Sequence, residues 1–208
     1  MFKPPVLCVT RAALTAQKIP DNNAYGIFPF NLSTIPDKNF HFIHRDIVDN
    51  DRPEYVEIGQ ALPQILGYCV IQCEDKILTY SRKKGAEAKL KDKRSIGFGG
   101  HVDIDDYNKN ENRPFIAALL NSIERELREE LNHVEAIGTK QLDKIIVDQT
   151  NLVGSVHVGL PLMLQLRSPD LISVDPNEIN DPQWVSIDEL KKDIEIYENW
   201  SKLIIENI

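Results

Sequence analysis

The stretch that decides the fold is 114–133, which reads PFIAALLNSIERELREELNH. Its apolar side chains recur every three or four residues, which is the repeat of one helix face. These side chains are Ile116, Leu119, Leu120, Ile123, Leu127 and Leu131. Pro114 suits a first helical turn, where a missing N–H leaves no bond unmade, and Asn132 can end the helix in a left-handed cap. We therefore expect one long helix with an apolar stripe.

Three glutamates stand near the end of this expected helix. Glu126, Glu129 and Glu130 are spaced i, i+3 and i+4, so a helix projects them onto one side. Like charges at this spacing oppose helix formation. A divalent cation that takes oxygen ligands, Mg2+ or Mn2+, would relieve the repulsion. Arg125 stands four residues before Glu129 and can pair with it. A solvated charged face is the plain alternative.

A glycine-rich segment precedes the helix. Residues 95–102 read SIGFGGHV and include Gly97, Gly99 and Gly100. Glycine permits a close approach of the backbone and positive φ angles, so carbonyl and N–H groups there can point at a ligand. A tight turn between a strand and a loop is the alternative interpretation. The segment becomes informative because it comes shortly before the three glutamates.

Strands are expected on both sides of the helix. Residues 65–73 are apolar and rich in β-forming residues, 74–75 are polar and can turn, and 76–82 alternate in polarity. This pattern predicts a β-hairpin. Residues 142–148 and 153–166 also indicate strands, because apolar β-formers dominate them.

The two ends of the chain differ in pattern. Asp181–Pro182 is expected to break the chain before a last helix, for which Ser186 and Glu189 form a capping box. Residues 1–60 carry scattered prolines and no clear period, so we expect an irregular N-terminal extension packed on a main domain, 61–208. Strands, helix, strands and helix in this order predict the class α/β (α+β), with a mixed sheet and helices on its faces.

The composition narrows the range of possible functions. The chain has 208 residues, with 24 Lys+Arg against 32 Asp+Glu and a net charge of -8. This acidic balance disfavours binding to nucleic-acid polymers or anionic membranes. No apolar run approaches the ~20 residues of a membrane span, and the first 20 residues lack the apolar core of a secretory signal. Cys8, Cys69 and Cys73 are expected to be buried free thiols, so we predict a cytoplasmic protein.

Taken together, these residues resemble the box of the Nudix hydrolase family. The second half of that box, Arg-Glu-apolar-x-Glu-Glu, is present as Arg125–Glu130, which reads RELREE. Residues 184–190, WVSIDEL, resemble the tryptophan-led entry to the last helix of the family. The resemblance covers roughly 65–195. Residues 81–101 also look like a branch of predicted MutT-type phosphoesterases.

The first half of the box departs from the family pattern. It starts at Gly100, and Asp106 stands where the family has a glutamate. Eighteen residues, Tyr107–Glu124, then precede Arg125 where the family has seven, which is an insertion of 11. Asp103 and Glu111 are alternatives for the acid in this half.

The resemblance implies a Nudix-type α/β/α sandwich and a metal-dependent hydrolase. The residues that match the metal ligands of the family are Glu126 and Glu130, with help from Glu129 and from the backbone carbonyl of Gly99. Arg125 matches the residue that orients a glutamate. The implied reaction is hydrolysis of a diphosphate linkage, in a nucleoside diphosphate derivative or a related small molecule, with Mg2+ or Mn2+ as cofactor.

Other roles remain open at this point. Glu129 and Glu178 are both candidates for the base that takes a proton from water. The segment 82–94 holds seven basic residues in 13 positions, from which Arg82 and Arg94 are the expected substrate contacts. A mobile solvated loop is the alternative for this segment.

Two other functions are also kept open. The altered first half of the box is also consistent with a non-catalytic regulatory module that binds a nucleotide. The other is an enzyme similar to isopentenyl-diphosphate isomerase. This alternative needs a catalytic cysteine, whereas Cys69 and Cys73 fall in an expected core strand. The expected partner is a small-molecule diphosphate, and a homodimer is one assembly that the resemblance allows.

Overall fold

The computed structural model describes residues 4–49, 55–82 and 93–208. The chain divides into two units. The first unit is Met1–Gly67, Gly99–Ile123 and Asp143–Leu160, and the second is Tyr68–Phe98, Glu124–Leu142 and Pro161–Ile208. The sequence-based division into 1–60 and 61–208 stays a prediction.

Three elements run through both units: β4 (Gln64–Cys73), α4 (Pro114–Glu130) and β11 (His157–Leu166). The first unit also contains β1 (Pro5–Val9), α1 (Arg11–Ala16), β2 (Tyr25–Pro29), β3 (Phe40–His44), α2 (Arg45–Val48), α3 (Val56–Ala61), β10 (Lys144–Asp148) and α5 (Leu152–Ser155). The second unit also contains β5 (Lys76–Arg82), β6 (Arg94–Ser95), β7 (Gly97–Phe98), β8 (Leu131–Val134), β9 (Gly138–Gln141), β12 (Ile172–Val174), β13 (Ile179–Ser186), α6 (Ile187–Lys192) and α7 (Asn199–Ile205).

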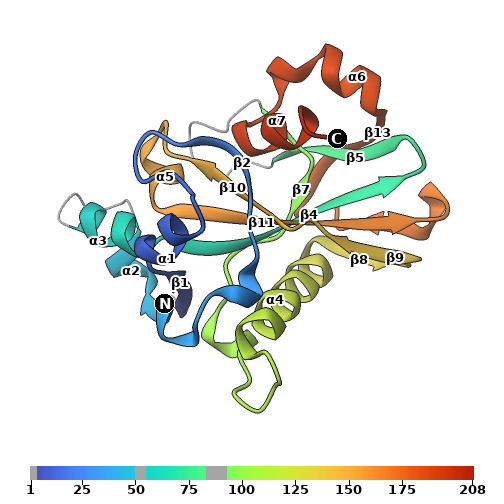
Figure 1. Ribbon diagram of the computed structural model, residues 1–208. Coiled ribbons are helices and arrows are strands. Elements are labelled where there is room, and N and C mark those ends of the chain that lie inside the picture. Colours follow the sequence, from blue (N-terminus) through green and yellow to red (C-terminus); the bar gives the residue numbers. More distant parts are fainter. Residues whose placement is uncertain (1–3, 50–54, 83–92) are drawn as a thin grey trace. The chain divides into compact units, whose positions relative to one another are not determined.

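The interpretation of residues 1–60 as irregular is wrong. Strand β1 pairs antiparallel with β3, with Leu7 opposite Phe42, and β2 pairs antiparallel with β10, with Ile27 opposite Ile146. Helices α1, α2 and α3 are grouped near β1 in Figure 1, and α2 contacts β3. Residues 6–9 of β1 are all buried, so this strand reads as a short apolar run and shows no period of two.

Helix α4 is present as predicted, and its stripe packs closely on β4. Leu119, Ile123 and Leu127 are buried, whereas Leu120 is 46% exposed. The approach to β4 is so close at Gly67 that a Cβ there would overlap the side chain of Ile123. The burial of this stripe stabilises a helix whose last turns carry like charges.

The expected left-handed cap at Asn132 is wrong. The residues other than glycine with positive φ, within the described ranges, are Lys18, Asn23, Glu74 and Asp181. The chain passes from α4 directly into β8, which pairs with β12. The amide of Asn132 instead donates a hydrogen bond to Val174 O at 3.0 Å. Strand pairing beyond the helix takes the place that the cap was expected to fill.

The predictions for the hairpin, for residues 142–166 and for the start of the last helix hold with small shifts. Strands β4 and β5 form the hairpin, and β10 lies within 142–148. The first residues of 153–166 belong to α5, whose N-cap Asn151 accepts from Gly154 N at 3.0 Å, and the strand begins at His157. The capping box of Ser186 and Glu189 is confirmed. No helix within the described ranges is long and apolar enough to span a bilayer.

The predicted break at Asp181–Pro182 is a bulge rather than an end. Strand β13 continues through it, paired with β5 on both sides. Asn180 lies opposite Ser81 and Gln183 opposite Thr79, so one extra residue is accommodated on β13. A proline inside a strand pattern is typical of such a bulge.

A histidine pair lies in the first unit. The Nε2 atoms of His101 and His157 are 3.3 Å apart, and Nδ1 of His157 lies 2.7 Å from Val153 O. A carbonyl only accepts, so Nδ1 of His157 carries the proton and its Nε2 accepts from His101. His157 is 6% exposed, and burial lowers its pKa.

We predict that acid destabilises the protein through His157. The unfolded chain takes up a proton at this residue near pH ~6.5, whereas the folded chain does so only at lower pH because burial lowers the pKa. The free energy of unfolding should therefore be highest above this pH and fall as the pH drops below it. Urea unfolding between about pH 7.5 and 5.5 measures the slope. His157→Gln should flatten it, whereas His133→Gln, on the exposed part of β8, should not.

Gly97, in the second unit, lies so close to the ring of Tyr68 that the position has no room for a side chain. A Cβ at this position would fall within the ring of Tyr68. That ring is not free to move, because the Tyr68 hydroxyl donates to Glu198 Oε1 at 2.7 Å and lies 2.8 Å from Ser201 Oγ. Gly97 thus lets β7 and β4 pair over the tyrosine, with Gly97 opposite Val70.

We expect Gly97→Ala to destabilise the protein by about 1–3 kcal/mol, the usual cost of overpacking a core. Gly138→Ala is the matched control, because the nearest atom to its added Cβ is Gln165 Oε1 at 4.0 Å. The free energy of unfolding in urea measures both. An unchanged stability in Gly97→Ala would contradict the close packing.

Candidate functional site

The carboxylates at the end of α4 are organised by one arginine. Nη1 of Arg125 lies 2.8 Å from Glu126 Oε1 and 3.6 Å from Glu129 Oε1. The side chain of Glu126 is 19% exposed and that of Glu129 is 59% exposed. The guanidinium thus bridges two of the three like charges, as the spacing predicted for Glu129. This bridge orients both carboxylates and offsets their repulsion.

Glu130 is the most enclosed part of the group. Its Oε2 atom is buried, although the residue as a whole is half-buried. The pKa of the Cys69 thiol, on β4, is raised to about 12. Burial is the larger cause, and the negative charge of Glu130 adds to it. Cys69 therefore stays a neutral thiol at physiological pH. The three cysteines are free and buried, as predicted.

The turn that carries Glu178 is attached to the end of α4. The N–H of Asp175 donates to Glu130 O at 3.0 Å, and Val174 pairs with Leu131 just before it. Within the turn, the N–H groups of Glu178 and Ile179 donate to Asp175 O at 3.1 and 2.9 Å. Glu178 itself is exposed. Two acids that lie far apart in the sequence, Glu130 and Glu178, are therefore joined by one short hydrogen-bonded path.

The glycine segment ends in the first unit. Gly99 has a φ of 135°, a value that side chains rarely allow, so glycine is required there. Gly100 O accepts from Gly67 N at 3.1 Å, and the next residue, His101, forms a bridge with Leu66. The backbone of this segment is thus fixed against the start of β4.

The acid expected in the first half of the box has a local partner. Asp106 is 7% exposed, and its Oδ2 accepts from Asp103 N at 2.9 Å in a short 3-10 turn, Ile104–Asp106. Its backbone carbonyl accepts from the amide of Asn121 on α4 at 2.9 Å. These contacts fasten the start of the insertion to the helix.

The helix also shows where the insertion lies. Because α4 is continuous over Pro114–Glu130, the position eight residues before Arg125 is two turns earlier on the same helix. That position is Ala117, and the first turn of α4 contains no acid. The extra residues therefore precede the helix, and the position that the family spacing would give to its first glutamate has no carboxylate.

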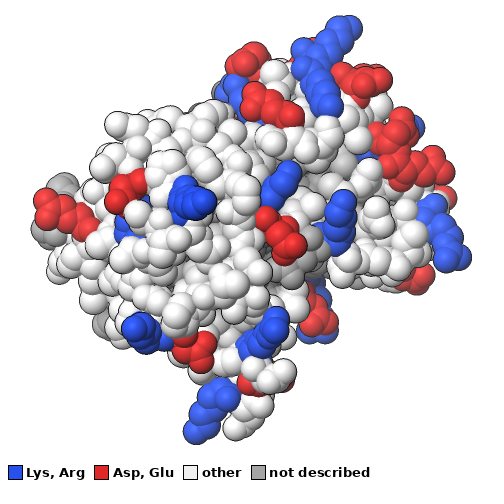
Figure 2. All heavy atoms as spheres, viewed as in Figure 1, with Lys and Arg blue, Asp and Glu red and all other residues white. Residues whose placement is uncertain are grey.

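The basic segment is described only in part. Lys83, Lys84, Lys89 and Lys91 lie outside the described residues. The backbone of Arg82 pairs with Ile179, and Lys93 donates to Glu195 O at 2.7 Å. On the face shown in Figure 2, Lys and Arg side chains stand among Asp and Glu side chains.

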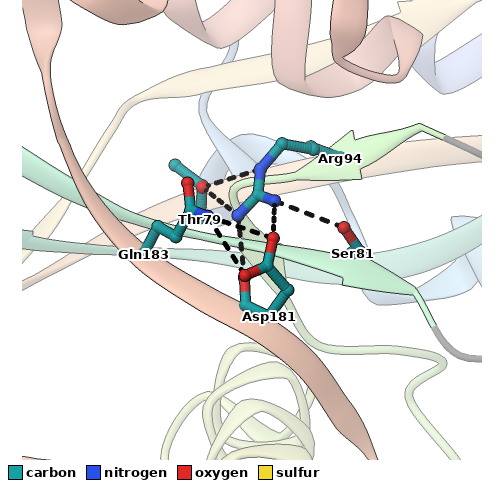
Figure 3. Close-up of polar contacts among 5 residues, drawn as sticks. All are labelled: Thr79, Ser81, Arg94, Asp181 and Gln183. Atoms are coloured by element: carbon teal, nitrogen blue, oxygen red, sulfur yellow. Dashed lines mark hydrogen bonds and ion pairs between the residues drawn. The ribbon is translucent and has the colours of Figure 1, made fainter.

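Arg94, an expected substrate contact, is surrounded by acceptors from its own chain (Figure 3). Its Nε and Nη2 donate to Thr79 Oγ1 at 3.1 and 2.8 Å. Nη1 donates to Ser81 Oγ at 3.3 Å and to Asp181 Oδ2 at 2.6 Å, and Nη2 also donates to Asp181 O at 2.8 Å. All five N–H groups of the guanidinium thus have an acceptor. The side chain is only 12% exposed.

Asp181 is the residue that sequence analysis missed. Its φ is 49°, in the left-handed region, and it precedes Pro182, which further restricts its backbone. Such a conformation costs about 1–2 kcal/mol in a residue with a Cβ. Hydrogen bonds from Arg94 and then from Gln183 hold the pKa of the Asp181 carboxyl below its ordinary value. The Asp-Pro pair was the available signal, since proline in a strand indicates a bulge.

The side chains do not form a finished metal centre. Within 4–49, 55–82 and 93–208, no group of three His, Cys, Asp or Glu side chains is arranged to hold a metal ion.

The chain is similar to one curated protein over most of its length. It is 35% identical over 171 residues to Protein YmaB of Bacillus subtilis (strain 168), and the match covers 78% of this chain and 77% of YmaB. No family model matches the chain.

Solved structures share the fold. Tm1382, a protein assigned to the Nudix hydrolases, has a TM-score of 0.70 and 22% identity, covering 97% of this chain and 96% of its own. DR0079 from Deinococcus radiodurans has a TM-score of 0.50 and 15% identity, covering 69% and 82%. The NUDIX domain of Shewanella oneidensis NrtR, solved with ADP ribose, has a TM-score of 0.50 and 13% identity, covering 69% and 84%. The mixed α+β class and the Nudix fold are therefore confirmed, and the chain belongs to the family of Protein YmaB from Bacillus subtilis.

Proposed function

We propose that this protein is a metal-dependent hydrolase that cleaves a diphosphate linkage in a nucleoside diphosphate derivative or a related small molecule. The observation that carries the proposal is the end of α4, where RELREE holds two carboxylates, Glu126 and Glu129, on one arginine and adds a third carboxylate at Glu130. The turn with Glu178 is hydrogen-bonded to the same helix end.

The donor set suits a hard cation. Glu126, Glu129 and Glu130 offer carboxylate oxygens, which Mg2+ and Mn2+ take together with waters and phosphate oxygens. The buried Oε2 of Glu130 supports the fit, because a buried carboxylate gains most from a nearby positive charge. We propose that these three glutamates hold the metal; the part of the Gly99 carbonyl stays a prediction from the sequence. When bound, such an ion neutralises phosphate charge and acidifies water.

The other residues have supporting roles in this proposal. Arg125 orients Glu126 and Glu129 through its two contacts. Glu129 and Glu178 are the candidates for the base that takes the proton of the attacking water. Both side chains are exposed, so both can exchange that proton with solvent.

A second candidate function has its own support. Ala117 and the hydrogen-bonded Asp106 leave the first half of the box without the carboxylate that the family spacing expects on the helix. A module that binds the same class of ligand without hydrolysis would fit this feature. The substrate contacts at Arg82 and Arg94, a small-molecule partner, a cytoplasmic location and a homodimer stay predictions.

We expect Glu130→Gln to lower kcat by about a hundredfold or more, as loss of a positioned catalytic group does. The assay measures release of phosphate or nucleotide from a panel of nucleoside diphosphate derivatives, ADP-ribose included, with Mg2+. Glu124→Gln is the matched control, because this glutamate is exposed on the same helix and pairs with the exposed Arg128. Wild-type rates in Glu130→Gln would contradict the hydrolase proposal.

Tight binding of one panel member without turnover would instead favour the non-hydrolytic module. Isothermal calorimetry on the same panel makes this distinction. No binding and no release by the wild-type protein across the panel would contradict both candidates.

Metal binding gives a test that does not depend on turnover. We expect Mn2+ to bind the wild-type protein and the Kd to rise by at least about tenfold in Glu126→Gln and in Glu130→Gln. Calorimetric titration of the metal measures the effect, with Glu124→Gln as control. Equal affinities in all four proteins would contradict the assignment of the ligands.

A further inference from the structure

Arg94 and Asp181 are connected to the turn that carries Glu178, and all of these residues lie in the second unit. We infer that Arg94 and Asp181 are positioning residues, whose contact fixes the backbone of β13 and thereby holds Glu178 in place for hydrolysis. The inference deepens the proposed function and rests on it. It gives Arg94 a role different from the substrate contact expected from the sequence.

The first step is the conformation of Asp181. The left-handed φ of 49° before Pro182 is unfavourable for a side-chain-bearing residue. Arg94 binds both the carboxylate and the backbone carbonyl of Asp181, at 2.6 and 2.8 Å. The same guanidinium is anchored to Thr79 and Ser81 on β5. Arg94 therefore fastens the bulge to the neighbouring strand at two points.

The second step is the register of β13. One extra residue lies between Asn180, which is opposite Ser81, and Gln183, which is opposite Thr79. If Asp181 relaxed to an extended conformation, the extra residue would have to move along the strand. A shift of one residue turns each side chain to the other face. The segment that would take up this shift is 175–180, on the N-terminal side of the bulge.

The segment 175–180 is also fixed at its N-terminal end. Asp175 N donates to Glu130 O at 3.0 Å, and the side-chain amide of Asn132 donates to Val174 O at 3.0 Å. A change at Asp181 therefore cannot move the whole segment as one piece. It must change the turn itself, where Glu178 and Ile179 donate to Asp175 O. Glu178 is thus held between the metal-ligand helix and the Arg94 contact.

The geometry also argues against a phosphate on Arg94. Each of its five N–H groups already has an acceptor, and 12% of the side chain is exposed. A phosphate would have to displace Asp181 or Thr79. Displacing Asp181 would release the strained bulge at the moment when substrate binds.

Steady-state kinetics separates the two roles. If Arg94 positions Glu178, Arg94→Gln and Asp181→Ala each lower kcat by at least about tenfold with KM nearly unchanged, because misplaced groups slow the chemical step. The double variant should be no slower than the slower single variant, since both act through one contact. Arg94→Lys, which keeps the charge without the planar fork, should resemble Arg94→Gln. Arg128→Gln, a surface arginine with 75% exposure, is the matched control for loss of a positive charge.

Amide hydrogen exchange tests the contact without any turnover. We expect the amides of Glu178 and Ile179 to exchange at least about tenfold faster in Arg94→Gln and Asp181→Ala than in the wild type and in Arg128→Gln. Unchanged exchange in both variants overturns the inference, whatever the kinetics show. A raised KM with unchanged kcat in Arg94→Gln, and wild-type kinetics in Asp181→Ala, also overturn it in favour of a substrate contact. If the wild-type protein hydrolyses nothing, the proposed function fails, and the exchange rates alone decide whether the contact holds the turn.

Discussion

The hydrogen bond from Asp175 N to Glu130 O is the contact on which the candidate site depends. The last turn of any α-helix leaves carbonyl oxygens without donors from the helix. In α4 one of these oxygens is satisfied by a residue 45 positions further along the chain, and strand pairing of β8 with β12 follows immediately. The need to satisfy a helix end therefore brings the backbone of a second acidic segment to the end of α4.

Charge is compensated locally around this helix end. Arg125 bridges Glu126 and Glu129, while Arg128 pairs with Glu124 one turn earlier. The apolar stripe of α4 supplies burial that outweighs the remaining repulsion, since helices in proteins are stabilised mainly by packing. The net charge of -8 is a poor guide to such an arrangement, because it does not say which carboxylates share a cation.

The role inferred for Arg94 depends on which groups surround its side chain in the fold. In the sequence it ends a basic segment and suggests phosphate binding. In the fold its planar guanidinium satisfies acceptors on two strands at once, which only arginine can do with five fixed donors. The left-handed φ of Asp181 is unfavourable, and the hydrogen bonds from the planar guanidinium of Arg94 stabilise it.

The sequence by itself determined the features that depend on neighbours in the chain. Helix α4, the β4–β5 hairpin and the capping box of Ser186 follow from periodicity and from side chains three or four residues apart. The RELREE motif likewise indicated the Nudix fold, which the structural neighbours confirm.

Only the tertiary structure decided the end of α4, the strands within 1–60, the bulge at Asp181 and the close fit of Gly97 on Tyr68. Each depends on a partner distant in the chain: Asp175 for Glu130, Phe42 for Leu7, Arg94 for Asp181. The local pattern of the sequence does not identify such partners, because the free energy that selects them comes from packing and hydrogen bonds between segments that meet only as the chain folds.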